Sequence, residues 1–103
     1  PPQHLAFVSL ALVLLVVIVL KARFGQGTPL RGGMPSGHAA LAFALSTILA
    51  FITESPLVMV LAFFLALLVS QSRLIHGIHS RLEVLWGALL GILIVIAIFG
   101  IFG

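Results

Sequence analysis

Four uninterrupted apolar stretches dominate the chain, and the polar residues gather in the segments between them. The stretches cover residues 5–20, 39–52, 57–69 and 84–102. None of them contains a charged residue. A membrane-spanning helix needs about 20 predominantly apolar residues. The first and last stretches reach that length with neutral flanks, and the middle two reach it if their helices begin near Ser36 and Ser55. The pattern therefore predicts four membrane-spanning helices.

The predicted helices define one all-α domain over residues 1–103. They cover residues 4–22, 36–53, 56–72 and 81–102. The third helix has a clear start signal, because Ser55 can cap it and Pro56 fits its first position. Four helices of marginal length favour a thin, tilted bundle. We therefore expect a polytopic, multi-pass protein of the cell membrane.

Composition excludes several classes of protein. Hydrophobic residues make up 62% of the chain and charged residues 7%, whereas soluble domains have about 45–50% and about 25%. A soluble enzyme and a disordered chain are both ruled out. The chain has no cysteine, which excludes disulfides, thiolate zinc sites and cysteine nucleophiles. The positive net charge comes from only five basic residues, so we expect no nucleic-acid partner.

Most charged residues fall at one end of the predicted bundle, because two crossings separate the loops that carry them. These are Lys21, Arg23, Arg31, Arg73, Arg81 and Glu83, six of the seven charged residues. His38, His76 and His79 fall on the same side. The tendency of Lys and Arg to mark cytoplasmic loops explains the cations. It does not explain three histidines, or an acid among the bases.

The loop at residues 24–38 has features that suit a phosphate group. It is rich in glycine and carries Arg31, so backbone and guanidinium donors can approach an anion. Ser36 can cap the second helix, which leaves the amides of Gly37 and His38 as donors at its positive end. The alternative is an interfacial turn with an ordinary serine cap.

The segment at residues 72–83 adds a guanidinium group and an imidazole–carboxylate pair. Arg73 offers a planar set of donors for phosphate oxygens. His79 and Glu83 are four residues apart, so on a helix they share a face. A carboxylate on one imidazole nitrogen leaves the other free to attack. Alternatively, Ser80 and Glu83 form a capping box. Both interpretations of Glu83 stay open.

These motifs resemble the type 2 phosphatidic acid phosphatase (PAP2) superfamily. Pro35-Ser36-Gly37-His38 is similar to its second motif, PSGH. Ser72-Arg73, followed by His79 and then an acid, resembles its third, SRxxxxxHxxxD, with Glu83 in place of Asp. The first motif, KxxxxxxRP, is only loosely matched by Lys21 and Arg31, and Arg23 is a rival for its lysine. The sequence also looks like the phosphatase part of bacterial proteins fused to a diacylglycerol-kinase-like domain.

The resemblance implies a minimal PAP2-like core that hydrolyses a lipid phosphate. His79 would be the nucleophile, Glu83 would orient it, and His38 would be the general acid and then the base. The residues implied to hold the phosphoryl group are Lys21, Arg31, Ser36, Gly37 and Arg73. Those expected around them are Ser72, His76 and Arg23. The implied substrates are phosphatidic acid, phosphatidylglycerophosphate or an isoprenyl diphosphate, and the implied location is the bacterial inner membrane.

No cofactor and no metal ion is expected, because Glu54 and Glu83 lie on opposite faces and cannot form a carboxylate cluster. The expected partners are the lipid substrate and membrane lipids, with a homodimer or a fused kinase-like domain as further possibilities. Gly87 and Gly91 form a GxxxG pattern that permits close helix packing, within the bundle or between subunits. Two other functions stay open: an anionic-lipid binding or transport module without turnover, and a structural membrane partner.

Overall fold

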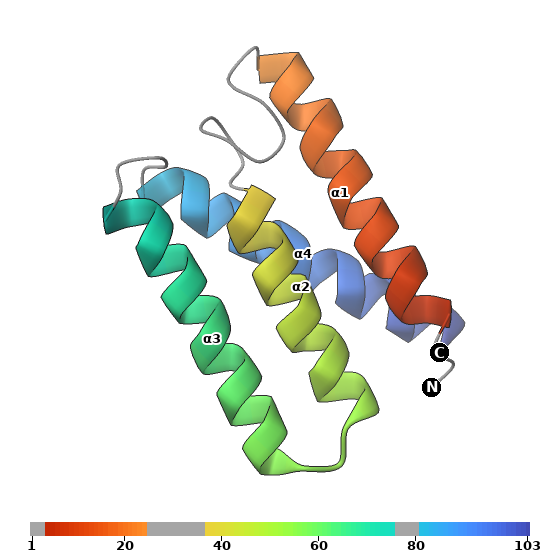
Figure 1. Cartoon of the computed structure of the whole chain (residues 1–103). Coiled ribbons are helices and arrows are strands. Elements are labelled where there is room, and N and C mark those ends of the chain that lie inside the picture. Colours follow the sequence, from red (N-terminus) through yellow and green to blue (C-terminus); the bar gives the residue numbers. More distant parts are fainter. Residues whose placement is uncertain (1–3, 25–36, 76–80) are drawn as a thin grey trace.

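The protein is a bundle of four α-helices in the computed structural model, which describes residues 4–24, 37–75 and 81–103 (Figure 1). The helices are α1 (His4–Phe24), α2 (Gly37–Ile52), α3 (Pro56–Ile75) and α4 (Arg81–Phe102). Within these ranges the chain has no strand. The predicted all-α fold with four helices is therefore confirmed. The observed helix ends differ most from the predicted ones at the end of α3, which continues for three residues beyond residue 72.

Side-chain oxygens fix the turn between α2 and α3. The Oγ of Ser55 accepts a hydrogen bond from the backbone N–H of Val58 at 3.3 Å, and Pro56 is the first residue of α3. The Oγ1 of Thr53 accepts a bond from the backbone N–H of Ser55 at 3.1 Å. The predicted serine cap is confirmed. These bonds satisfy backbone donors that a helix start leaves without intrahelical partners.

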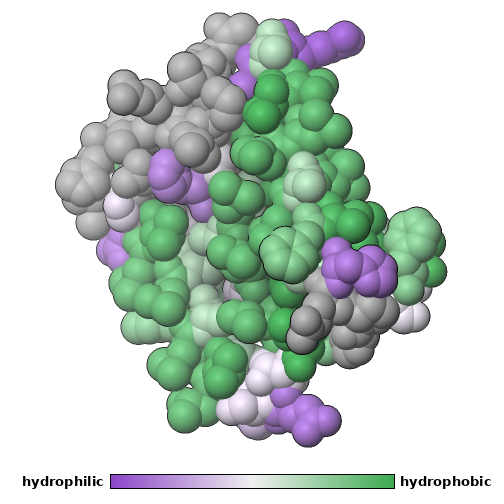
Figure 2. Space-filling model, turned by 45° about the vertical axis from the view of Figure 1, so that its right-hand side comes forward, coloured by the Kyte–Doolittle hydropathy of each residue, from purple (hydrophilic) through white to green (hydrophobic). Residues whose placement is uncertain are grey.

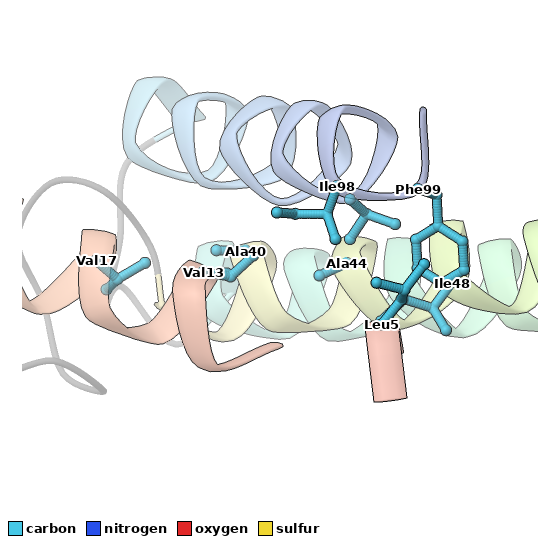
Figure 3. Close-up of a cluster of buried hydrophobic side chains, with 9 residues drawn as sticks. Leu5, Val13, Val17, Ala40, Ala44, Ile48, Ile98 and Phe99 are labelled. Atoms are coloured by element: carbon cyan, nitrogen blue, oxygen red, sulfur yellow. The ribbon is translucent and has the colours of Figure 1, made fainter. Parts of the chain in front are cut away.

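Helix α2 is the centre of the bundle, since it packs extensively against each of the other three helices, whereas α4 contacts α3 only slightly. Within the described residues, α1 and α3 make no contact with each other. The main apolar core lies between α1, α2 and α4 (Figure 3). Its buried members are Leu5, Val13, Val17, Ala40, Ala44, Ile48, Val95, Ile98 and Phe99. The ring of Phe99 also stacks on Phe51 of α2, with centroids 4.9 Å apart.

Helices α2 and α4 approach each other most closely at Gly91. A Cβ atom on Gly91 would collide with the backbone carbonyl oxygen of Ala40 and lie 3.1 Å from the backbone nitrogen of Ala44. Gly91, Ala40 and Ala44 are all buried. Small residues on both helices thus let the two backbones meet, as in membrane helix pairs. The sequence left open whether this glycine packs inside the bundle or between subunits, and the structure places it against α2.

The face of the bundle drawn in Figure 2 is largely apolar where its residues are described. Large hydrophobic side chains are exposed on all four helices; Phe7, Leu57 and Leu65, for example, are 75%, 67% and 62% exposed. Two helical segments, His4–Arg23 and Arg81–Phe102, are long and apolar enough to cross a membrane, and α2 and α3 contain shorter apolar segments. Such extensive exposed apolar surface is typical of a protein that contacts lipid rather than water.

Candidate functional site

Four helix ends that lie far apart in the sequence form one end of the bundle. These are the end of α1, the start of α2, the end of α3 and the start of α4. They lie at the same end because consecutive helices run in opposite directions (Figure 1). Glu54 lies at the other end, in the turn between α2 and α3. The structure therefore gathers most of the described polar candidates at one place. We call this place the polar end. Its described candidate residues are Lys21, Arg23, Gly37, His38, Ser72, Arg73, Arg81 and Glu83.

His38 lies in the first turn of α2, directly after Gly37. Gly37 is buried and His38 is half-buried. The Nδ1 atom of His38 is inaccessible to solvent. The first turn of a helix carries backbone N–H groups without intrahelical acceptors and a positive partial charge. The imidazole of His38 therefore stands where a negative group would be stabilised.

Lys21 near the end of α1 and Glu83 near the start of α4 carry opposite charges at the polar end. Lys21 is only 2% exposed, and Glu83 is half-buried in the first turn of α4. The carboxylate of Glu83 attracts the ammonium group of Lys21 electrostatically. A buried ammonium group is costly unless an opposite charge compensates it. Glu83 is therefore part of what allows Lys21 to lie inside the bundle.

Sequence reasoning assigned Lys21 to the phosphate group and left Glu83 between His79 and a capping box with Ser80. It did not predict an attraction between Lys21 and Glu83. Two signals were available. Their charges are opposite, and both positions had been placed on the same side of the membrane. What the sequence could not supply is the arrangement of α1 and α4, which lets the charge of Glu83 act on Lys21.

The other described candidates surround this pair. Ser72 is half-buried near the end of α3, whereas Arg23 and Arg81 are exposed. Arg73 belongs to the last turn of α3, and its side chain lies outside the described part. Lys21, His38, Ser72 and Glu83 each have an interaction partner. The polar end thus combines cations, an imidazole and a carboxylate.

Several predicted site residues lie outside the described residues. They are Arg31, Ser36, His76 and His79. Ser80 lies outside as well, so neither the His79–Glu83 pair nor the capping box of Ser80 and Glu83 can be compared with the structure. The assignment of these residues stays a prediction.

No cluster suited to a metal ion is formed by the residues that the structure describes. In residues 4–24, 37–75 and 81–103, no three His, Asp or Glu side chains come together. The groups at the described polar end are instead two kinds of cation, one imidazole and one carboxylate. Cations of this kind can neutralise the charge of a phosphoryl group.

The Lys21–Glu83 attraction can be measured by a double-mutant cycle on the free energy of unfolding in detergent. We expect Lys21→Met and Glu83→Gln to destabilise the protein singly, because each leaves one charge uncompensated. The double variant should recover part of the loss, with a coupling free energy of about 1–2 kcal/mol. The matched cycle with the exposed Arg23→Met should show no coupling. Strictly additive effects of Lys21→Met and Glu83→Gln would contradict the pairing.

The structure is an all-helical bundle with a largely apolar exterior, and its polar end carries cations, an imidazole and a carboxylate. A family model described as the PAP2 superfamily matches residues 23–103. The match covers α2, α3 and α4 and most of the chain, so this protein belongs to the PAP2 superfamily. Comparisons with curated proteins and with solved structures give no match. Membership in this superfamily indicates a phosphatase-type function.

Proposed function

We propose that this protein is an integral membrane lipid phosphatase, with four membrane crossings, that hydrolyses a phosphate monoester or diphosphate of a lipid. The observation that carries the proposal is the family match over residues 23–103, together with the position of the matched polar residues. His38 lies in the first turn of α2 and Glu83 in the first turn of α4, at the same end of the bundle. The apolar exterior supports a substrate that reaches the site from the membrane.

The proposed reaction has two steps at the polar end. In the first, a ring nitrogen of His79 attacks the terminal phosphorus, and the bond from that phosphorus to the leaving oxygen breaks. The leaving group is the lipid alkoxide of a monoester, which takes a proton from His38, or the lipid monophosphate of a diphosphate. In the second, water attacks the phosphohistidine, His38 takes a proton from that water, and inorganic phosphate leaves. Because Nδ1 of His38 is inaccessible to solvent, we assign the proton transfers to Nε2.

The other residues hold and orient the reacting groups. Glu83 orients His79 and stabilises its positive charge, and the same carboxylate attracts Lys21. The phosphoryl oxygens are bound by the cations and by donors at the start of α2, namely Lys21, Arg31, Arg73, Ser36 and Gly37. Phosphoryl transfer depends mainly on positioning and on neutralising charge. These residues supply both, so the mechanism needs no metal ion.

The position of the polar end supports a lipid phosphate as the substrate class. A phosphate bound there lies at the level of lipid headgroups, and its hydrocarbon part can remain beside the apolar helices. Phosphatidic acid, phosphatidylglycerophosphate and isoprenyl diphosphates all meet these requirements. We place the protein in a bacterial inner membrane.

Phosphate release from these three lipids, with and without EDTA, tests the proposal. We expect release from at least one of them, at a rate that EDTA changes by less than about twofold, because guanidinium and ammonium groups replace a metal. A soluble phosphate monoester without a hydrocarbon chain serves as the comparison and should be a poorer substrate. Tight lipid binding with no phosphate released from any of the three would contradict the proposal and favour a binding module.

A further inference from the structure

A shallow groove runs along the outside of the bundle between α2 and α3. Its volume is about 290 Å³, close to the lower end of the range for ligand pockets. The lining residues are Ala42, Leu45, Ser46, Leu49, Ala62, Leu65, Ala66 and Val69. Ser46 and Ala66 are buried and form its floor, whereas Leu45 and Leu65 are exposed at its sides. Small residues on facing helices leave the hollow, and larger ones border it.

The groove begins next to the polar end. Ala42 follows His38 by four residues in α2, and Val69 precedes Arg73 by four residues in α3. One helical turn, a rise of about 6 Å, separates each pair. From there the groove extends along α2 to Leu49, about 10 Å further toward the other end of the bundle. Both helices that carry a motif of the candidate site at this end also form the walls of the groove.

The groove and the polar end have complementary chemistry for one kind of molecule. The groove lining is apolar except for the hydroxyl of Ser46, whereas His38 lies one helical turn beyond it in α2. The cation Lys21 lies at the same end of the bundle, on α1. A ligand that fits both must have an anionic head and a hydrocarbon chain. A helix of a partner protein would fit the apolar part but would not use the polar end.

We propose that the groove between α2 and α3 binds a hydrocarbon chain of the lipid phosphate substrate and sets the preference for chain length. This rests on the proposed function, because it assigns a place to the lipid part of the same substrate. The headgroup lies beside His38, and the chain follows Ala42 and Val69 down to Ala62 and Leu49. The deeper half of the groove adds no binding free energy for substrates whose chains end before Ala62.

Filling the deep half of the groove tests this inference. Ala62→Leu should lower kcat/KM about tenfold for dioleoyl phosphatidic acid and change it by less than about twofold for the dihexanoyl form. Ala62 lies eleven residues before Arg73 in α3, far from the reacting groups. The matched control is Ala50→Leu, at an exposed position of α2 outside the groove, which should change neither value. An equal effect of Ala62→Leu on both substrates would overturn the inference.

Photolabelling provides a measurement that does not need turnover. A non-hydrolysable phosphonate lipid with a diazirine at the end of its chain should label the lining residues of α2 and α3. An analogue with an uncharged hydroxyl head should label them several-fold less. Equal labelling by both probes would mean that the groove holds bulk lipid, and would overturn the inference. Groove labelling by the phosphonate, combined with no phosphate release from any lipid, would support the groove and reject the proposed phosphatase.

The sequence allows one more check, because it contains no cysteine. A single Leu65→Cys substitution places a thiol at the side of the groove. Under oxidising conditions in membranes, we expect this variant to form no disulfide-linked dimer. An efficient disulfide between two copies would show that a second chain covers the groove, which would overturn the proposed lipid site.

Discussion

Alanine in place of His79 should lower phosphate release from a lipid phosphate by roughly 10⁴-fold or more, since no other group replaces the nucleophile of a covalent mechanism. Alanine in place of His38 should cost about 10²–10⁴-fold, the usual contribution of a general acid or base. The measurement is the initial rate of phosphate release by purified protein in detergent or liposomes. The unfolding temperatures should stay close to that of the unsubstituted chain.

The controls separate the two histidines from a general effect of substitution. His4→Ala removes an exposed imidazole at the beginning of α1, at the opposite end of the bundle from α2's first turn, and should leave the rate unchanged. Aryl phosphates have leaving groups that need little protonation. His38→Ala should therefore lose much less activity on aryl than on alkyl esters, whereas His79→Ala should lose the same on both. A His79→Ala variant with full activity would reject the proposed mechanism.

The second large effect is expected at Gly91. Glycine to alanine in a helix usually stabilises it by about 0.5–1 kcal/mol. Here the added methyl group collides with the backbone of Ala40, and a backbone cannot move aside as a flexible side chain does. We expect Gly91→Ala to lower the free energy of unfolding by about 2–3 kcal/mol. Activity should fall as well, because α2 carries His38 and α4 carries Glu83.

Gly100 provides the matched control on the same helix. A Cβ atom there would meet no atom within 4 Å, so Gly100→Ala should be neutral or slightly stabilising. Thermal or denaturant unfolding in one detergent compares the two variants, and phosphate release gives the functional readout. If Gly91→Ala unfolds like Gly100→Ala, then α2 and α4 do not pack as closely as described.

The sequence predicted the fold class and the number of helices because each apolar run is free of charge and ends at polar or turn residues. Ser55 and Pro56 even specify how α3 begins, since capping depends on neighbouring atoms only. The family resemblance was also readable, because the PSGH and SR motifs are short and local. The roles of His79 and Arg31 stay predictions, because both residues lie outside the described part of the chain.

The sequence could not predict in the same way which face of each helix is buried. In a soluble helix, polar residues mark the outer face, and the period of the pattern reveals the inner one. In this chain both the buried Val13 and the exposed Leu14 are apolar, so the pattern carries no such information. For the same reason the groove between α2 and α3 left no signal in the sequence.

By itself, the sequence determined that this chain forms four apolar helices, the approximate position of each, and that their polar ends can meet. Local rules of hydrophobicity, capping and helix length are enough for that. Only the tertiary structure decided that Gly91 packs against Ala40 within one chain and that Lys21 lies near Glu83. Those pairings depend on how each helix is rotated about its axis. The rotation is set by close packing of shapes between helices, not by a difference in polarity.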